Sequence, residues 1–343
     1  MILVLVEIDD GALALVSQEA LTFARGLGEP VEAVVLAAPG TDTSAAVADC
    51  AVQGVARVHL VDGPDLISYA AAAWASVVAG VLAETGASTL VASGSGRASE
   101  ILAHVAARLD VPMAANALEA SPVGESTEAV GGQARMPDQG SDTGTGLLVR
   151  RQVLGGAVVE STLLAAVPAI LTVAGHAVEP VAAPVAGAAS VVTVTPRIEP
   201  DDLRAQVASV TPRSGGDGAS LTKAKVVVGA GRGAGGPDGF GGVDALAAKL
   251  GGVVGVSRVV TSLGWRPHHE QVGQTGSRIN PDLYVPCGIS GAIQHWAGCS
   301  SSKTIIAINT DAEAPMVTKA AYAIVGDMHE VIPAILAALD KRG

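Results

Sequence analysis

Short apolar runs alternate with longer segments of helical spacing along the first half of the chain. Runs rich in Val, Leu and Ile predict buried strands at 2–8, 31–37, 57–61 and 89–92. Segments of helical length and spacing separate them, at 12–27, 66–84 and 98–109. Because strands that alternate with helices form parallel sheets covered on both faces, this half is predicted to be an α/β domain.

The composition changes between residues 179 and 221. Prolines occur at 180, 184, 196, 200 and 212, and glycines cluster at 215–218. Such a stretch is typical of a junction between domains. Residues 190–195 are rich in β-branched side chains and predict a strand within it. We therefore expect an N-terminal domain at 1–210 and a C-terminal domain at 211–343.

A second series of strands and helices follows the junction. Strands are predicted at 225–228, 253–256, 283–285, 304–308 and 322–325. Helices are predicted at 243–250, 290–297 and 328–339. The fold class is therefore α/β, with two doubly wound domains whose sheets are mostly parallel. Residues 131–146, rich in Gly, Asp and Gln, are predicted to form a surface loop.

Composition narrows the classes of function. The formal net charge is -12 and the isoelectric point is about 5.0. No cluster of Lys and Arg supplies the basic patch typical of nucleic-acid binding, so no nucleic-acid partner is expected. Cys50, Cys287 and Cys299 form no CxxC pair, so no metal site is expected either, and three free thiols are typical of a reducing compartment.

Two uncharged stretches, 66–83 and 161–178, approach the length of a membrane span. Alanine dominates the first and Pro168 interrupts the second, so we interpret both as buried elements. The N-terminus is apolar and acidic, without the basic region of a signal peptide or the Arg-rich character of a transit peptide. We expect a cytoplasmic, prokaryotic protein that does not insert into a membrane.

Candidate chemistry gathers where the predicted strands of the second domain end. These ends carry Arg232, Ser257-Arg258, Gly288-Ile289-Ser290, Asn309 and Asp327. In open α/β sheets ligands bind beyond the carboxyl ends of the strands. The corresponding ends of the first domain are more acidic and carry no arginine before Arg97. A phosphate-bearing ligand is therefore expected in the second domain, and the first is expected to be a docking scaffold without a nucleotide.

The turn GAGRGA, residues 229–234, formally fits the GxGxxG/A pattern of nicotinamide-binding sheets. That pattern requires a helix that starts at once and an acidic residue after the next strand. Here the helix is predicted only from Val243, and the next strand ends in Ser257-Arg258. A nicotinamide site is thus the weaker interpretation, and a tight turn with Arg232 in solvent remains a structural alternative.

Two further segments suit a flat, anionic ligand. VGQTG, residues 272–276, combines two glycines with an amide and a hydroxyl, although an ordinary surface turn has the same composition. In GISGAIQHWAG, residues 288–298, Ser290 is expected to cap a helix whose first N–H groups favour an anion. His295 follows in that helix, where it is either a ligand contact or a packed histidine.

These segments carry a resemblance to a known family. GAGRG, GVSR, VGQTG, GISGAIQH, AIN and the Gly326-Asp327 step, in this order, resemble the FAD-binding domain of electron-transfer flavoprotein alpha subunits. The likeness runs almost continuously from Lys225 to about Pro333, and VGQTG with SGAIQH is its most specific part. The first domain is similar mainly in length and in its α/β pattern.

The resemblance implies a Rossmann-like domain whose residues hold FAD. It places Arg232 at the pyrophosphate, Thr275 near flavin N5, His295 near the N1–C2=O edge, and Arg258 against the ring, so the last three would tune the flavin. The implied cofactor-binding residues are Arg232, Ser257, Arg258, Val272, Gly273, Gln274, Thr275, Ser290, Gly291, Ala292, Ile293, Gln294, His295, Asn309, Asp327 and Met328.

The resemblance also implies a heterodimer with an electron-transfer flavoprotein beta subunit. Such a pair carries electrons, in fatty acid β-oxidation and related oxidations, from acyl-CoA or related dehydrogenases to a membrane electron-transfer flavoprotein quinone oxidoreductase. It is an electron carrier without substrate chemistry of its own rather than a conventional enzyme. Two alternatives stay open: an NAD(P)- or FAD-dependent oxidoreductase that uses His268-His269 as acid or base, and a nucleotide-binding subunit without redox activity.

Overall fold

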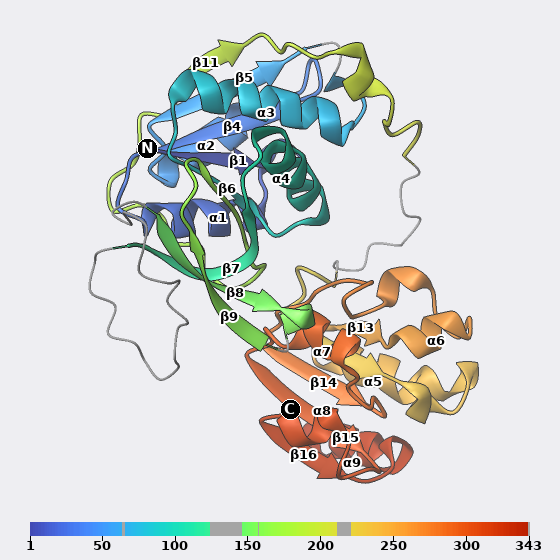
Figure 1. Ribbon diagram of the computed structural model, residues 1–343. Coiled ribbons are helices and arrows are strands. Elements are labelled where there is room, and N and C mark those ends of the chain that lie inside the picture. The colour runs from blue at the N-terminus through green and yellow to red at the C-terminus, as the bar shows by residue number, and fades with distance from the viewer. Residues whose placement is uncertain (64–65, 124–145, 157, 211–220, 342–343) are drawn as a thin grey trace. The chain divides into compact units, whose positions relative to one another are not determined.

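A computed structural model describes residues 1–343 except 64–65, 124–145, 157, 211–220 and 342–343. It divides into two compact units, one of Met1–Val153 with Val158–Val210 and one of Leu154–Ala157 with Thr211–Gly343. Each is an α/β unit built on a mostly parallel sheet, as the sequence predicts (Figure 1). Residues 131–145 of the predicted surface loop lie outside the described residues.

The first unit is built on a long twisted sheet. In spatial order its strands are β11 (Ser190–Val194), β5 (Arg57–Asp62), β4 (Val31–Ala37), β1 (Ile2–Val6), β6 (Thr89–Ser93), β10 (Ala169–Val173), β7 (Met113–Pro122), β8 (Leu147–Val153) and β9 (Val158–Leu164). The strands from β11 to β7 pair in parallel, whereas β8 and β9 pair antiparallel. The central parallel strands β1, β6 and β10 are almost continuously apolar and fully buried because helices cover both of their faces.

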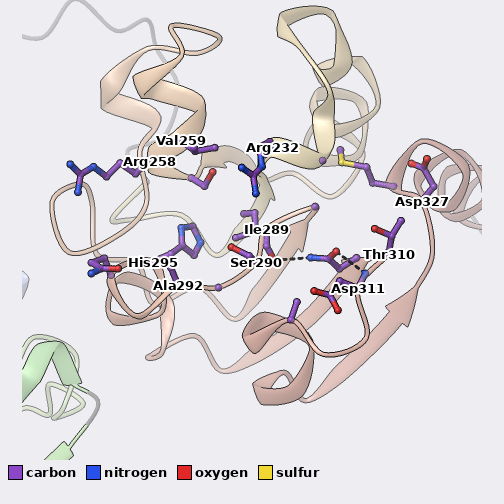
Figure 2. Close-up of a pocket in the computed structure, with 18 of the residues that line it drawn as sticks. Arg232, Arg258, Val259, Ile289, Ser290, Ala292, His295, Thr310, Asp311 and Asp327 are labelled. Atoms are coloured by element: carbon purple, nitrogen blue, oxygen red, sulfur yellow. Dashed lines mark hydrogen bonds between the residues drawn. The ribbon is translucent and has the colours of Figure 1, made fainter.

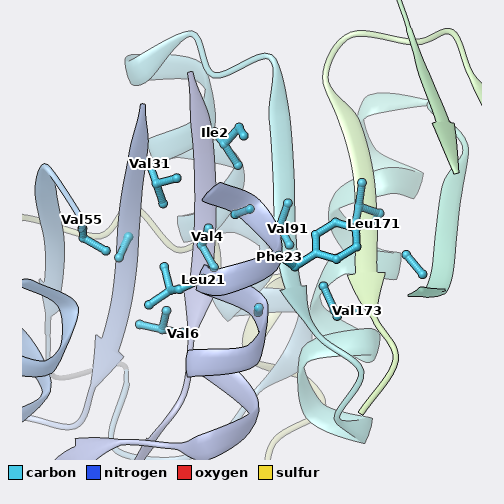
Figure 3. Packing of buried hydrophobic residues seen from close by; sticks show 14 of the residues in the cluster. Ile2, Val4, Val6, Leu21, Phe23, Val31, Val55, Val91, Leu171 and Val173 are labelled. Atoms are coloured by element: carbon cyan, nitrogen blue, oxygen red, sulfur yellow. The ribbon is translucent and has the colours of Figure 1, made fainter. Parts of the chain in front are cut away.

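Helices α1 (Leu15–Arg25) and α2 (Ser44–Val52) cover one face of this sheet, and α3 (Ala71–Thr85) and α4 (Gly96–Leu109) cover the other (Figure 1). Figure 3 shows Phe23 of α1 beside the strand residues Val91 and Leu171, whereas Leu21 lies nearer Val4 and Val6. Burying a side chain of this size stabilises the fold by about 1.5–3 kcal/mol. Many such side chains form two hydrophobic clusters, one on each face of the sheet.

Several predicted boundaries of the first unit are wrong. The helix predicted from residue 12 begins at Leu15, because Ile8–Asp9 (β2) and Ala12–Leu13 (β3) form a small antiparallel ribbon first. The helix predicted from residue 66 begins only at Ala71. Leu66 is buried ahead of α3 and does not belong to that helix, so its apolar character reflects packing rather than the periodicity of α3.

The second unit is a smaller, fully parallel sheet. In spatial order its strands are β13 (Val253–Val256), β12 (Val226–Ala230), β14 (Leu283–Cys287), β15 (Thr304–Asn309) and β16 (Tyr322–Val325). Helices α5 (Gly241–Lys249) and α9 (Met328–Asp340) cover one face, and α7 (Ile293–Cys299) and α8 (Pro315–Lys319) cover the other. A further short helix, α6 (Arg258–Ser262), follows β13 directly.

Three cysteines lie in these cores as free thiols: Cys50 in the first unit, and Cys287 and Cys299 in the second. Burial is the main cause that raises the pKa of each thiol to about 12. In the part of the chain that the structure describes, no helix combines the length and apolar composition needed to cross a membrane.

Asp202 lies in a 3₁₀ turn (Pro200–Leu203) and ties it to two helices. The Ser76 hydroxyl of α3 and the Arg108 guanidinium of α4 donate hydrogen bonds to its two carboxylate oxygens, each at 2.6 Å. Burial alone would raise the pKa of Asp202, but these bonds outweigh it and hold that pKa below its usual value.

Asp202→Asn should therefore lower the free energy of unfolding by about 1–3 kcal/mol at neutral pH, because it replaces charge-assisted bonds. The contribution of Asp202 is complete above the unfolded-state pKa of about 4 and is lost as the pH falls through the lower folded value. Urea titrations at about pH 3 and pH 7 measure this difference, which the variant should reduce. The exposed neighbour Asp201 provides the control Asp201→Asn; equal effects of both substitutions would contradict the prediction.

Candidate functional site

The second sheet contains a pocket where its strand order reverses. Numbered along the chain, its strands lie in the order 2-1-3-4-5, so β12 and β14 are neighbours whose connections leave in opposite directions. Open α/β sheets bind ligands in the crevice at such a point, beyond the carboxyl ends of the strands. A pocket with a volume of about 750 Å³ opens there (Figure 2). Ligand sites usually have volumes of about 300–1,000 Å³.

Each strand of this sheet contributes the residues that follow it. The lining consists of Arg232 and Gly233 after β12; Ser257, Arg258, Val259 and Ser262 after β13; Gly288, Ile289, Ser290, Gly291, Ala292, Gln294 and His295 after β14; Asn309, Thr310, Asp311 and Ala314 after β15; and Gly326, Asp327 and Met328 after β16.

The floor of the pocket is a crossing of two glycine turns. The Gly231 N–H donates to the Cys287 carbonyl at 3.0 Å, and the Gly233 N–H donates to the Gly288 carbonyl at 3.1 Å. A Cβ atom added to Gly231 would lie 2.3 Å from the Gly288 oxygen, and one added to Gly233 would lie 2.6 Å from the Gly288 Cα. Glycine is needed here because backbone packs on backbone, which fixes where Arg232 leaves the turn.

Arg232 and Arg258 give this pocket its positive charge. Both side chains are exposed, and neither guanidinium pairs with a carboxylate among the described residues. Ser257 occupies the N-cap position of α6 without making a capping bond through its side chain. Unpaired arginines beside a free hydroxyl are well suited to bind phosphate oxygens.

The opposite wall carries acidic and amide groups that form hydrogen bonds with other groups of the chain. The Asn309 side chain donates to the Ile289 carbonyl at 3.0 Å and accepts from the Asp311 N–H at 3.1 Å. Asp327 caps α9 by accepting from the His329 N–H at 2.8 Å. In Figure 2, Asp327 lies on the side of the pocket opposite Arg258 and His295. The pocket is therefore polarised, with Arg258 and His295 at one end, Asp327 at the other and Arg232 between them.

His295 lines the pocket from α7 and is almost completely buried. Its Nε2 lies 2.8 Å from the Tyr284 hydroxyl, whereas its Nδ1 has no hydrogen-bond partner in the described part of the chain. Burial lowers the pKa of His295 to about 4, and the Val272 backbone opposes this shift in part. The residue is thus neutral near pH 7 and offers a hydrogen bond rather than a charge.

The VGQTG turn lies beside the pocket rather than in its lining. A Cβ atom on Gly298 of α7 would come within 2.4 Å of the Gly273 Cα, so the turn packs directly on the helix that carries His295. Buried Gln271 braces it, because its amide donates to the Thr275 hydroxyl at 3.1 Å and accepts from Thr261 at 2.7 Å.

The structure brings most of the predicted site residues together. Those that line the pocket are Arg232, Ser257, Arg258, Ser290, Gly291, Ala292, Gln294, His295, Asn309, Asp327 and Met328. Those outside the lining are Val272, Gly273, Gln274, Thr275 and Ile293. The prediction missed Val259, Ser262, Thr310, Asp311 and Ala314, which follow β13 and β15 and extend the same strand-end signal by a few residues.

One local expectation is wrong. Ser290 does not cap a helix, because α7 begins at Ile293 and its N-cap is Ala292. Gly291 has a φ of +78°. A Cβ atom added to it would lie 2.5 Å from the backbone nitrogen of Met316. This left-handed residue breaks the helical path that the sequence pattern indicates.

The structure does not provide the features that a nicotinamide site or an acid–base site at His268-His269 would need. Two 3₁₀ segments, at Arg232–Ala234 and Pro237–Phe240, separate the glycine turn from helix α5. The turn is therefore not followed at once by an α-helix whose first N–H groups could bind a pyrophosphate. His268 and His269 are exposed and do not line the pocket. The arginines and the neutral His295 of this pocket therefore suit a ligand with an anionic part and a hydrogen-bond acceptor better than acid–base chemistry by His268 and His269.

Comparisons with known proteins agree with this site. A family model described as "Electron transfer flavoprotein domain" matches residues 2–198, and one described as "Electron transfer flavoprotein FAD-binding domain" matches residues 220–300. The chain is 34% identical to the electron transfer flavoprotein subunit alpha of Mycobacterium leprae, over 99% of this chain and 98% of that protein. The corresponding subunit of Bacillus subtilis is 30% identical, over 97% of this chain and 95% of that protein. The chain therefore belongs to the electron transfer flavoprotein alpha-subunit family.

Proposed function

We propose that the chain binds FAD in this pocket and forms a heterodimer with a beta subunit. In that complex it passes electrons from flavoprotein dehydrogenases, such as acyl-CoA dehydrogenases, to a membrane quinone oxidoreductase. The observation that carries the proposal is a pocket whose two arginines pair with no carboxylate among the described residues, and whose buried histidine has a ring nitrogen without a hydrogen-bond partner there. Buried polar atoms without partners are uncommon and point to a missing ligand.

Residues of the lining and of the neighbouring VGQTG turn have roles in this proposal. Arg232 neutralises the pyrophosphate, and Ser257 donates to the same region. Arg258 and His295 lie at the end that takes the isoalloxazine ring, and Thr275 approaches the ring from the turn braced by Gln271. Asp327 and Met328 meet the adenosine end. The chain engages one amide hydrogen and one oxygen lone pair of Asn309, which fixes the side chain at the adenosine end and leaves its second N–H free to donate to the cofactor.

FAD supplies the one-electron chemistry, and the chain supplies binding and electrostatics. Arg258 places positive charge near the ring, and His295 offers a hydrogen bond at the edge where charge develops on reduction. No acid or base is needed for this role, which agrees with the exposed position of His268 and His269 outside the lining.

Arg232→Ala should weaken FAD binding by about ten- to a hundredfold, the loss of one charge-assisted contact. Isothermal titration of the FAD-depleted complex with FAD measures the change. Lys249→Ala is the matched control, because Lys249 is a cation of the same unit that pairs with Asp340 away from the pocket. Purified protein without flavin absorption bands in the visible range, and with no FAD uptake, would overturn the proposal in favour of a subunit without redox activity.

The isolated chain should retain FAD poorly, and co-expression with its beta subunit should restore one FAD per heterodimer. The physical reason is that one wall of the pocket is exposed: Arg258, Val259 and Ser262 on α6 face solvent in the free chain. A partner that covers this wall would slow cofactor loss. Gel filtration with flavin analysis tests the idea, and stoichiometric FAD on a monomeric chain would contradict it.

A further inference from the structure

The hydroxyl group of Tyr284 packs closely against a glycine of the neighbouring strand. Tyr284 is fully buried on β14, and a Cβ atom on Gly229 of the neighbouring strand β12 would lie 2.5 Å from the phenol oxygen. Glycine weakens a strand, so its presence opposite the ring is explained by the room that the hydroxyl needs. The phenol oxygen then reaches the Nε2 atom of His295 at 2.8 Å.

The two possible directions of this hydrogen bond leave different numbers of buried groups unpaired. If Nε2–H donated to the phenol, the Tyr284 proton would have no acceptor among the described residues, and Nδ1 would be a buried lone pair. If the phenol donates to Nε2, both of those groups are accounted for. The imidazole proton is then on Nδ1, and besides Tyr284 only the Val272 backbone, which raises the pKa of His295, acts on the ring as a hydrogen-bonding group among the described residues. Unpaired buried groups are costly, so the second arrangement is favoured.

Ionisation does not disturb this arrangement. Burial raises the pKa of Tyr284 well above its usual value, so the phenol keeps its proton. The groups that face the dyad from the surrounding elements are the Cys287 and Cys299 thiols and the Val272 backbone. The two thiols are themselves neutral near pH 7, because burial raises the pKa of each to about 12.

We propose that Tyr284 is a positioning residue that fixes His295 as the Nδ1–H tautomer, so that His295 serves its ligand only as a hydrogen-bond donor. This inference rests on the proposed FAD site for its consequence, because an electron-rich flavin edge requires a donor. The tautomer itself is a property of the chain without any ligand. A His held in this way selects a carbonyl or anionic edge and rejects a ligand that presents an N–H group.

The test is ¹⁵N NMR of the full chain labelled at histidine, in which the protonated and bare ring nitrogens have well-separated shifts. His295 is assigned by the signal that disappears in His295→Asn. Around neutral pH the wild-type chain should carry the proton on Nδ1. In Tyr284→Phe the Nε2–H form should become populated, and FAD binding should weaken by about three- to tenfold. Tyr322→Phe, which removes the hydroxyl of an exposed tyrosine in the same unit, should change neither quantity.

A proton on Nε2 in the wild-type chain would overturn the proposal, even if Tyr284→Phe failed to fold. An unchanged tautomer in Tyr284→Phe would also overturn it. Failure of the FAD function is distinguishable from both, because a chain that binds no flavin still reports its tautomer. If FAD binds normally while Tyr284→Phe alters neither the tautomer nor the affinity, the flavin function stands and the positioning role falls.

Discussion

Gly231→Ala should destabilise the second unit by about 2–4 kcal/mol and remove FAD binding with it. The added methyl group would lie 2.3 Å from the Gly288 carbonyl oxygen and 2.8 Å from the Ile289 side chain. The carbonyl belongs to the turn after β14 and cannot move without breaking its own bond to Gly233. Relief of the overlap therefore separates the two turns that form the floor of the pocket. Chemical denaturation followed by far-ultraviolet circular dichroism measures the loss.

The neighbouring Gly236 provides a control in the same segment. An added Cβ there meets nothing within 4 Å, and its backbone is extended, with a φ of 172°. Gly236→Ala should therefore be neutral or slightly stabilising, because alanine restricts the unfolded chain. Unfolding of both variants at the same denaturant concentration would show that the glycine crossing is not required.

His295→Ala should lower the first one-electron reduction potential of bound FAD by roughly 60–130 mV. A hydrogen bond to a group that gains negative charge contributes about 1.5–3 kcal/mol, and about 1.4 kcal/mol corresponds to 59 mV for one electron. FAD should stay bound, because Arg232 and Ser257 hold its other end. His295→Asp should lower the potential further, since it places negative charge beside the ring. Spectroelectrochemical titration of the heterodimer measures both variants.

The control for this experiment is His268→Ala, which removes an exposed imidazole outside the pocket lining. The effect of His295→Ala should also be nearly constant between about pH 5 and 8, because His295 has a pKa of about 4 and stays neutral throughout. An unchanged potential with FAD still bound would make His295 a packing residue and assign the tuning to Arg258.

Short parallel strands were the most predictable part of the fold. β13 and β16 begin and end where the sequence places them, because a short apolar run between Gly or polar residues has few other solutions. The antiparallel strands β7, β8 and β9 were not predicted as a set. Strand β7 pairs with β8 through residues as far apart in the sequence as Pro122 and Leu147, so no local sequence pattern specifies the pairing. Helix α2 was missed because its alanine-rich sequence lacks a clear apolar stripe.

The candidate site followed from topology more than from motifs. Arg232, Ser257, Asn309 and Asp327 line the pocket because each lies at the carboxyl end of a parallel strand or within two residues of it, and those ends converge. Gln271 and Tyr284 could not be found in this way, since their importance lies in hydrogen bonds to Thr275 and His295 that only the folded chain creates.

The buried thiols allow the opening of each unit's core to be measured separately. Cys50 lies in the first unit, and Cys287 and Cys299 lie in the second, all fully inaccessible and with thiol pKa values of about 12. A thiolate reagent can therefore label them only when the surrounding core opens. Labelling followed by peptide mass spectrometry would yield separate opening free energies for the two units from the unaltered chain. FAD that binds only the second unit should slow modification of Cys287 and Cys299 and leave the rate at Cys50 unchanged.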